Sequence, residues 1–320
     1  MAVTPFESAP SRSPTHLSGY PRRDHEVIDY RMCELPRTGL EFRGPLPPSL
    51  APGSYFVCVG AAQTFGCFCE EPFPSLLSKS LELPVLNLGY GGAGPAFFLS
   101  QPALLEIINA ARLAVVQVMS ARSESNSRFD SGGLEYLLRR SDGARLGADE
   151  AWQAELDGTG ILPKQQAPWL RWCARRVGRI RARRLVAETR RNWIESNGRL
   201  AAAIRVPKVL SWFSTRAPHY ATSYRNLGTL FAAFPNLVNE PMLAAVRPHF
   251  DRTAECVSAR GSPQPLRSRF TGAPCSVDPG RDRPDLGGNL WTHNYYYPSP
   301  EMHQDAARVL QPVLRELLER

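Results

Sequence analysis

The chain has 320 residues, 43% of them hydrophobic, and its 38 Lys and Arg against 30 Asp and Glu give a formal net charge of +8. The length allows one large domain or two ordinary ones, and the hydrophobic fraction excludes wholesale disorder. No apolar run approaches the ~18 residues of a membrane span, so no membrane span is expected. Seven scattered cysteines and an N-terminus without an apolar segment predict a cytoplasmic protein without a disulfide scaffold.

Residues 1–50 are rich in Pro, Ser and charge and are interpreted as an N-terminal arm without a core of its own. From residue 51 to residue 320 we expect a single domain. The predicted strands span residues 55–59, 85–88, 114–119, 209–213 and, more weakly, 255–258. The predicted helices span residues 73–81, 102–112, 169–203 and 301–318, with another inside 236–250.

Alternating strands and helices predict the fold class α/β, a three-layer α/β/α sandwich with a mostly parallel sheet. Residues 124–165 look like loops and short helices, and they begin a helical, Arg-rich insertion at about residues 130–205. In such sheets ligands bind beyond the carboxyl ends of the strands. Three loops, at residues 60–66, 89–95 and 120–126, are therefore expected to meet at one edge.

The first loop combines glycines with two polar side chains. Gly60 begins it, and Gln63 and Thr64 lie inside it. Glycine permits a tight turn, and a following helix offers unpaired N–H groups to an anion. The loop carries neither a phosphate-binding Lys-Ser/Thr pair nor a dinucleotide fingerprint. An ordinary strand-to-helix turn is the alternative interpretation.

The second and third loops supply the other candidate ligands of an anionic group. Gly91 and Gly92 lie among the four glycines of residues 89–94, where backbone N–H groups could approach a phosphate or an oxyanion. Arg122 follows the third strand, and the loop ends at Asn126. Tight packing of the glycines and a solvated arginine are the structural alternatives.

His303 precedes the last predicted helix and follows three tyrosines and a Pro-Ser-Pro turn. At that position an imidazole could reach the same edge and act as a general base, or it could be structural. Cys67 and Cys69 leave a thiol nucleophile open, but they lack the second ligand pair of a zinc site, so no metal is predicted. The nine arginines between Arg171 and Arg191 fit a surface helix first, an anionic cofactor or a membrane surface second, and nucleic acid least.

The order of these blocks resembles the SGNH hydrolase superfamily, whose fold is a three-layer α/β/α sandwich similar to flavodoxin. Residues 60–66 share the frame of its Gly-Asp-Ser-x-Thr-x-Gly block, and Asn87, Gly89 and Gly92 match Asn-x-Gly-x-x-Gly. The chain departs from the family at the positions that carry its catalytic groups. Ala62 replaces the nucleophilic Ser, Arg122 replaces the oxyanion-hole Asn, and Pro300 replaces the Asp that orients His303. The departures exclude the serine acyl-enzyme mechanism at Ala62.

Residues 60–66, 72–74 and 296–303 also resemble a group of uncharacterised bacterial proteins often named sulfotransferases. That resemblance implies sulfuryl transfer from 3′-phosphoadenosine-5′-phosphosulfate, an anionic small-molecule donor, to a hydroxyl or amine acceptor. In this interpretation Gln63, Thr64, the glycine loop and Arg122 hold the transferring group, and His303 takes the acceptor proton. The alternatives are an SGNH-type esterase or acyltransferase with another nucleophile, and a catalytically inactive module that binds anions or carbohydrate.

Overall fold

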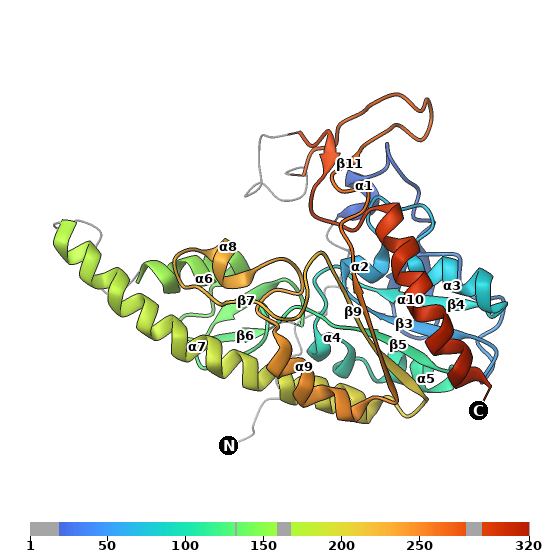
Figure 1. Cartoon of the computed structure of the whole chain (residues 1–320), viewed down its shortest axis with the longest axis horizontal. Coiled ribbons are helices and arrows are strands. Elements are labelled where there is room, and N and C mark those ends of the chain that lie inside the picture. The colour runs from blue at the N-terminus through green and yellow to red at the C-terminus, as the bar shows by residue number, and fades with distance from the viewer. Residues whose placement is uncertain (1–18, 132, 159–167, 280–289, 320) are drawn as a thin grey trace, which may run out of the picture.

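The computed structural model describes residues 19–131, 133–158, 168–279 and 290–319. Its centre is a five-stranded parallel sheet in the order β10-β9-β5-β3-β4 (Figure 1). The strands are β3 (Phe56–Gly60), β4 (Val85–Gly89), β5 (Ala114–Gln117), β9 (Lys208–Ser214) and β10 (Arg252–Val257). Numbered along the chain among themselves, these strands lie in the flavodoxin-like order 2-1-3-4-5. The predicted fold class, α/β with a mostly parallel sheet, is confirmed.

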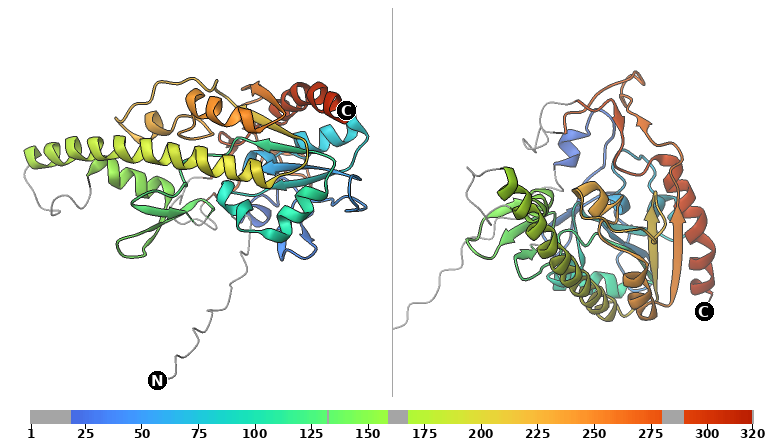
Figure 2. Two further views of the ribbon diagram at one scale, coloured as in Figure 1. Left: turned by 90° about the horizontal axis from the view of Figure 1, so that it is seen from below. Right: turned by 60° about the vertical axis from the view of Figure 1, so that its left-hand side comes forward.

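Helices cover both faces of this sheet, as the right-hand view of Figure 2 shows for α10 (Pro300–Leu318) and α7 (Pro168–Ala203). With α10, α3 (Phe73–Leu81) packs on one face through a cluster that includes Phe56, Leu77 and Leu310. On the other face lie α4 (Pro95–Leu99), α5 (Pro102–Ala110), α9 (Glu240–Val246) and the C-terminal half of α7. Every residue of β3 is buried, as expected for a parallel strand covered on both sides.

The described part of the N-terminal arm joins the main core. Residues 19–50 form α1 (Tyr20–Arg23) and the antiparallel pair of β1 (Cys33–Leu35) and β2 (Leu40–Phe42). Tyr30 and Phe42 are buried against the core residues of the sheet. Arg43 follows β2 and donates hydrogen bonds to four carbonyls between Phe65 and Glu70. The arm and the sheet therefore share one apolar interior, while residues 1–18 lie outside the described residues.

The insertion contains strands that the periodicity did not predict. Three short antiparallel strands, β6 (Phe129–Ser131), β7 (Tyr136–Arg139) and β8 (Arg145–Gly147), form a small sheet before α6 (Ala148–Asp157) and α7. Each strand has only three or four residues, too few for alternating burial to stand out in the sequence. Of the residues expected to be loops and short helices, 159–165 lie outside the described residues.

The remaining elements are short connections around the sheet. They are α2 (Ala62–Phe65), α8 (Leu227–Phe231), the 3₁₀ turn η1 (Arg247–His249), β11 (Gln264–Pro265) and β12 (His293–Asn294). The C-terminal helix α10 begins directly after its N-cap residue, Ser299. Ser299 accepts a hydrogen bond from the Met302 N–H, and Pro300 occupies the first turn, where its missing N–H costs nothing.

Candidate functional site

The loops that follow β3, β4 and β5 meet at one edge of the sheet and enclose a small pocket. The pocket lies at the point where the strand order reverses, between the ends of β3 and β5. Its volume is about 30 Å³, room for one or two water-sized groups. Its lining comes from residues 61–63, 92–94 and 120, 122–124, from Ser131, Gly133 and Glu135 beside the small sheet, and from Tyr20, Ala96, Phe234, Asn236 and Tyr296.

Of the first loop, Gln63 lines the pocket and Thr64 does not. The Thr64 hydroxyl lies 2.5 Å from Gln117 Oε1, which also accepts a hydrogen bond from the Ala61 N–H. These bonds hold the turn after β3 and leave Thr64 fully buried. Gln63 is 3% exposed, and its Oε1 has no hydrogen-bond partner among the described residues. A buried acceptor without a partner is costly, so Gln63 is a candidate ligand-binding residue.

The glycines at Gly60 and Gly92 are closely packed against other parts of the chain. A side chain at Gly60 would collide with Thr64 and Gln117, and at Gly92, where φ is +73°, it would come within 2.8 Å of the Glu135 N. Gly92 lines the pocket, whereas Gly60 and Gly91 do not. Backbone N–H groups of the second loop, residues 89–94, also donate hydrogen bonds within the chain.

The N–H of Gly89 donates to Asn87, that of Tyr90 to the Gly60 carbonyl, that of Ala93 to Tyr90, and that of Gly94 to Gly133. Four of the donors expected to cradle an anion therefore already have acceptors within the chain. The predicted backbone nest is absent at these four positions.

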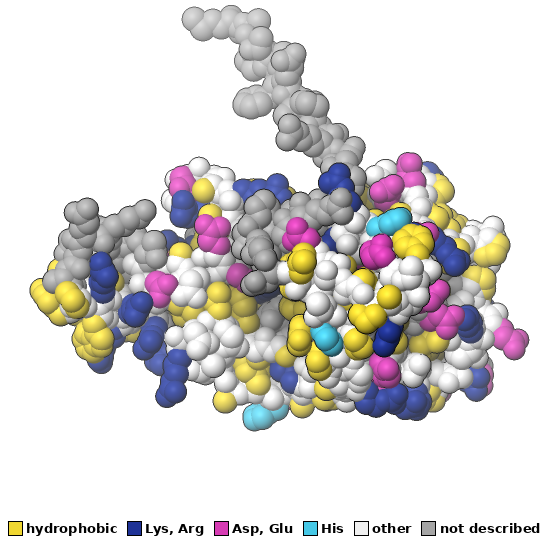
Figure 3. Space-filling view, turned by 90° about the horizontal axis from the view of Figure 1, so that it is seen from above, with side chains coloured by type: hydrophobic (Ala, Val, Ile, Leu, Met, Phe, Trp, Pro, Cys, Tyr) yellow, Lys and Arg dark blue, Asp and Glu magenta, His cyan; other side chains and the backbone are white. Residues whose placement is uncertain are grey.

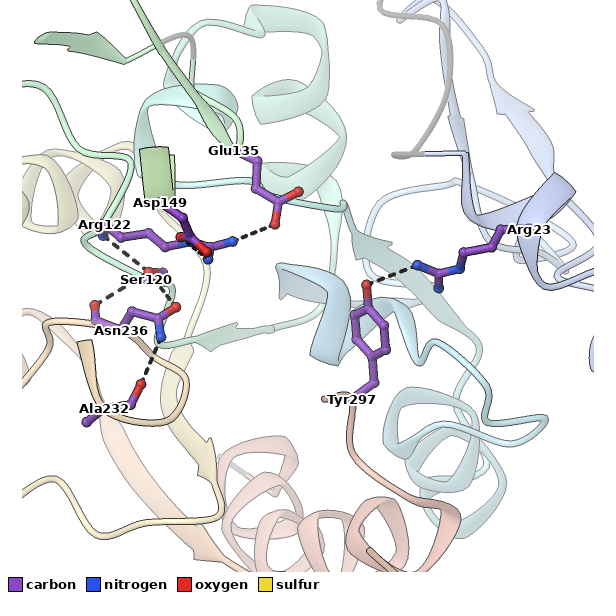
Figure 4. A network of polar contacts seen from close by, with 8 residues as sticks. All are labelled: Arg23, Ser120, Arg122, Glu135, Asp149, Ala232, Asn236 and Tyr297. Carbon is purple, nitrogen blue, oxygen red and sulfur yellow. Dashed lines mark hydrogen bonds and ion pairs between the residues drawn. The ribbon is translucent and has the colours of Figure 1, made fainter. Parts of the chain in front are cut away.

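Arg122 lines the pocket as predicted, but it forms ion pairs with two carboxylates. Its guanidinium donates to Glu135 at 2.6 Å and to Asp149 at 3.0 Å (Figure 4). Burial by itself lowers the pKa of Arg122, but the nearby acidic groups outweigh it and the pKa is raised. Arg122 is thus a permanently charged group whose forked donors are already paired, which leaves little for an incoming anion.

Two further polar groups in the lining, Glu124 and Ser120, have partners within the chain. Glu124 is 7% exposed and accepts a hydrogen bond from Ser196, and burial raises its pKa despite that bond. The Ser120 hydroxyl lies 3.4 Å from both oxygens of Asn236 (Figure 4). The sequence analysis missed Glu135 and Asn236, because no motif accompanies either residue and both reach the pocket from loops far along the chain from β3.

The structure does not bring His303 into the pocket lining. The imidazole is fully buried between Phe73 and Phe213, with ring centroids 6.0 and 5.3 Å away. Its Nδ1 accepts a hydrogen bond from the Phe73 N–H, and its Nε2 has no partner among the described residues. Burial, aided by Arg43, lowers its pKa to about 3. His303 lies outside the pocket lining because α10 packs its first turn against α3.

Asn126 also lies outside the lining. Its Oδ1 accepts hydrogen bonds from the Arg128 and Phe129 N–H groups, and its Nδ2 donates to Thr189. These bonds hold the turn into β6 against α7. The residue that closes the third loop therefore has a structural role in the geometry, and its predicted part in cofactor binding has no contact to support it.

The cysteines near the first loop are buried thiols. Burial raises the pKa of Cys69 to about 12 and that of Cys67 well above its ordinary value. Neither lines the pocket, so the geometry offers no thiolate nucleophile there. Within the described ranges, no three His, Cys, Asp or Glu side chains cluster in a way that could hold a metal ion. Those ranges also contain no helix that combines the length and the apolar character of a membrane crossing.

Comparisons with known proteins place most of the chain in a family without an assigned activity. The model of the family described as Domain of unknown function (DUF6473) matches residues 19–130 and 174–318. No curated protein matches the chain. The fold is similar to a solved structure of a carbohydrate esterase family 2 enzyme plus carbohydrate binding domain from Corynascus thermopiles (Myceliophthora fergusii). It is 9% identical, with 88% of this chain and 71% of that chain covered and a TM-score of 0.35.

Proposed function

Because the chain belongs to the family described as Domain of unknown function (DUF6473), and that description assigns no activity, we propose a function from the pocket alone. We propose that the pocket binds one end of a small hydroxyl- or amine-bearing ligand without forming a covalent bond to it. The observation that carries the proposal is Gln63, a buried amide whose Oε1 lacks a hydrogen-bond donor within the described ranges.

The donor and acceptor balance of the lining supports this ligand class. Among the lining residues, Gln63 Oε1 is the buried acceptor that has no donor in the described part of the chain, so a ligand that donates an O–H or N–H group complements it. Tyr20, Phe234 and Tyr296 add apolar ring surface beside this acceptor, as in most small-molecule sites. The ligand class matches the acceptor of the predicted transfer reaction and also the predicted binding module.

The proposal does not include covalent catalysis or the adenylated sulfate donor. Ala61 and Ala62 line the pocket where the resembling hydrolases carry Asp and Ser. Arg122 is paired with Glu135 and Asp149, so a sulfate or phosphate would have to displace a carboxylate. A volume of about 30 Å³ at the strand ends holds one functional group of a ligand, as the proposal requires. Neither matched description mentions sulfuryl transfer.

A thermal-shift and calorimetric titration tests the proposal. Methyl glycosides, glycerol and ethanolamine are compared with sulfate and with adenosine 3′,5′-bisphosphate. We expect a member of the first group to raise the melting temperature by mass action, and Gln63→Leu to weaken its binding by about 1 kcal/mol, the usual size of one hydrogen bond. The exposed Gln153→Leu on α6 is the matched control and should bind as the wild type does.

Three results would overturn the proposal. Stabilisation by adenosine 3′,5′-bisphosphate, with none by the hydroxyl or amine compounds, would favour the predicted sulfuryl donor. Stoichiometric labelling by a fluorophosphonate probe would reveal a reactive Ser and favour the esterase alternative. Binding of a methyl glycoside that is unchanged in Gln63→Leu would place the ligand in another part of the molecule.

A further inference from the structure

The long helix α7 has a projecting N-terminal half whose outer side is both apolar and strongly basic. In Figure 1 the helix extends to the left beyond the sheet and its covering helices. Its first part packs on α6, where Ala174, Gly178 and Ala182 are buried. At 3.6 residues per turn, these three residues share one side of the helix. The opposite side of residues 168–187 forms a separate surface of the helix.

Four large apolar side chains are exposed on this surface. Trp169 and Trp172 are 65% and 61% exposed, and Val177 and Ile180 are 45% and 49% exposed. Trp169 and Ile180 fall on the side of the helix away from the buried small residues. Figure 3 shows hydrophobic side chains gathered with basic ones at this projecting end. Arg176 lies over the ring of Trp172, 5.5 Å from its centroid, so apolar and basic side chains adjoin on this side of the helix. Exposed apolar side chains gathered in this way are typical of an interaction surface.

The charge on the same segment is one-sided. Residues 168–187 contain no Asp or Glu and seven arginines: Arg171, Arg175, Arg176, Arg179, Arg181, Arg183 and Arg184. Asp157 on α6 lies 3.7 Å from Arg175. By contrast, Arg190, further along α7, donates to Leu237, Tyr220 and Thr222 and belongs to the packed part of the helix. Six of these seven arginines are exposed, so the outer side of residues 168–187 carries a strong positive charge that complements an anionic partner.

We propose that residues 168–187 of α7 dock on an anionic lipid bilayer surface. Tryptophan and aliphatic side chains enter the boundary between headgroups and acyl chains, while flanking arginines contact the anionic headgroups. A nucleic-acid backbone would take the arginines but would gain nothing from exposed Val177 and Ile180. A second copy of the same helix would bring like charges together, which opposes association. An anionic bilayer complements both the exposed apolar side chains and the arginines of this surface.

Vesicle co-sedimentation of the full chain tests this proposal. We expect binding to phosphatidylcholine vesicles that contain phosphatidylserine, little binding to phosphatidylcholine alone, and weakening with added salt. Replacing Arg171, Arg175 and Arg179 together by Gln should weaken binding by roughly 10- to 100-fold. A matched control removes the same net charge elsewhere, with Arg112, Arg205 and Arg308 replaced by Gln, and should bind nearly as the wild type does.

The apolar half of the surface is tested separately. Trp169→Ala with Trp172→Ala should weaken vesicle binding by about tenfold or more. Phe270→Ala, at a side chain that is also 61% exposed, is the control. Lipids brominated near the headgroup should quench the fluorescence of the wild type and not that of the double variant. Circular dichroism melting should be unchanged in each variant, because the replaced side chains are exposed.

Three results would overturn the proposal. The first is absence of binding to the phosphatidylserine vesicles. The second is salt-sensitive binding to duplex DNA or RNA that keeps its affinity in the tryptophan double variant, which would assign the arginines to nucleic acid. The third is concentration-dependent self-association in sedimentation velocity that the tryptophan replacements abolish while vesicle binding persists unchanged, which would assign the surface to a second copy of the chain.

Discussion

At the scale of single residues, His303 differs most between the sequence prediction and the structure. Its ring fills a space between two phenylalanines, and burial lowers its pKa from the ordinary 6.5 to about 3. An imidazole in this state is neutral near pH 7, outside the pocket lining, and held by one hydrogen bond from the Phe73 N–H. The geometry therefore supports a packing role, and a role as general base has no contact in its favour.

The lowered pKa of His303 makes a prediction about stability and pH. The unfolded chain binds the proton more readily than the folded chain, so protonation favours unfolding. The contribution of neutral His303 to the free energy of unfolding is fully present above pH 6.5. It falls by ~1.4 kcal/mol per pH unit as the pH drops from 6.5 toward 3. Urea unfolding at several pH values should show this slope in the wild type and its loss in His303→Gln. The exposed His249→Gln should keep the slope, and equal slopes in all three proteins would contradict the assigned burial.

At the scale of elements, the contact of α6 with α7 depends on Gly178. A side chain there would come within 2.7 Å of the Gly158 N and 2.8 Å of the Glu155 carbonyl. Gly198, on the same helix, has nothing closer to such a side chain than His249 Nε2 at 3.6 Å. The two glycines therefore have the same helix propensity and opposite surroundings, which makes them a matched pair.

Helix propensity alone predicts that Gly→Ala stabilises both positions by up to about 1 kcal/mol. We expect this gain for Gly198→Ala and a loss of about 1–3 kcal/mol for Gly178→Ala, because the helices must separate to admit the methyl group. Denaturant midpoints of the two variants measure the difference. A stabilised Gly178→Ala would mean that α6 and α7 are not in close contact in solution.

At the scale of the whole molecule, the N-terminal arm and the sheet share an interior. Arg43 joins them, since its buried guanidinium donates to the carbonyls of Phe65, Gly66, Cys69 and Glu70, and burial lowers its pKa. We expect Arg43→Leu to lower the free energy of unfolding by roughly 3 kcal/mol, because four carbonyls lose their donors. The exposed Arg37→Leu on the same arm should change it little.

The shared interior also predicts that the arm and the sheet unfold in one cooperative transition. Far-ultraviolet circular dichroism and tryptophan fluorescence should then give coincident curves in the wild type. Separate transitions, or equal effects of Arg43→Leu and Arg37→Leu, would show that the arm is energetically independent of the domain.

The sequence by itself determined the elements of the sheet and their common edge. Short apolar runs such as residues 56–60 and 114–117 are buried on both faces, and the 36-residue α7 lies within one residue of its predicted start. Local periodicity suffices for these features, because burial of each element follows from its own residues. That residue 62 is Ala and carries no nucleophilic side chain was equally visible, since it depends on the identity of one residue.

Only the tertiary structure decided what the polar residues of the edge do. Glu135 and Asp149 form ion pairs with Arg122. Gln117 accepts a hydrogen bond from the Thr64 hydroxyl, and His303 accepts one from the N–H of Phe73 on α3. Each of these partners comes from another loop or element, so its choice depends on how the elements pack and not on the spacing within a motif. The sequence therefore located the pocket, whereas long-range packing paired Arg122, buried His303 outside the lining, and left Gln63 Oε1 in the lining with no donor among the residues that the structure describes.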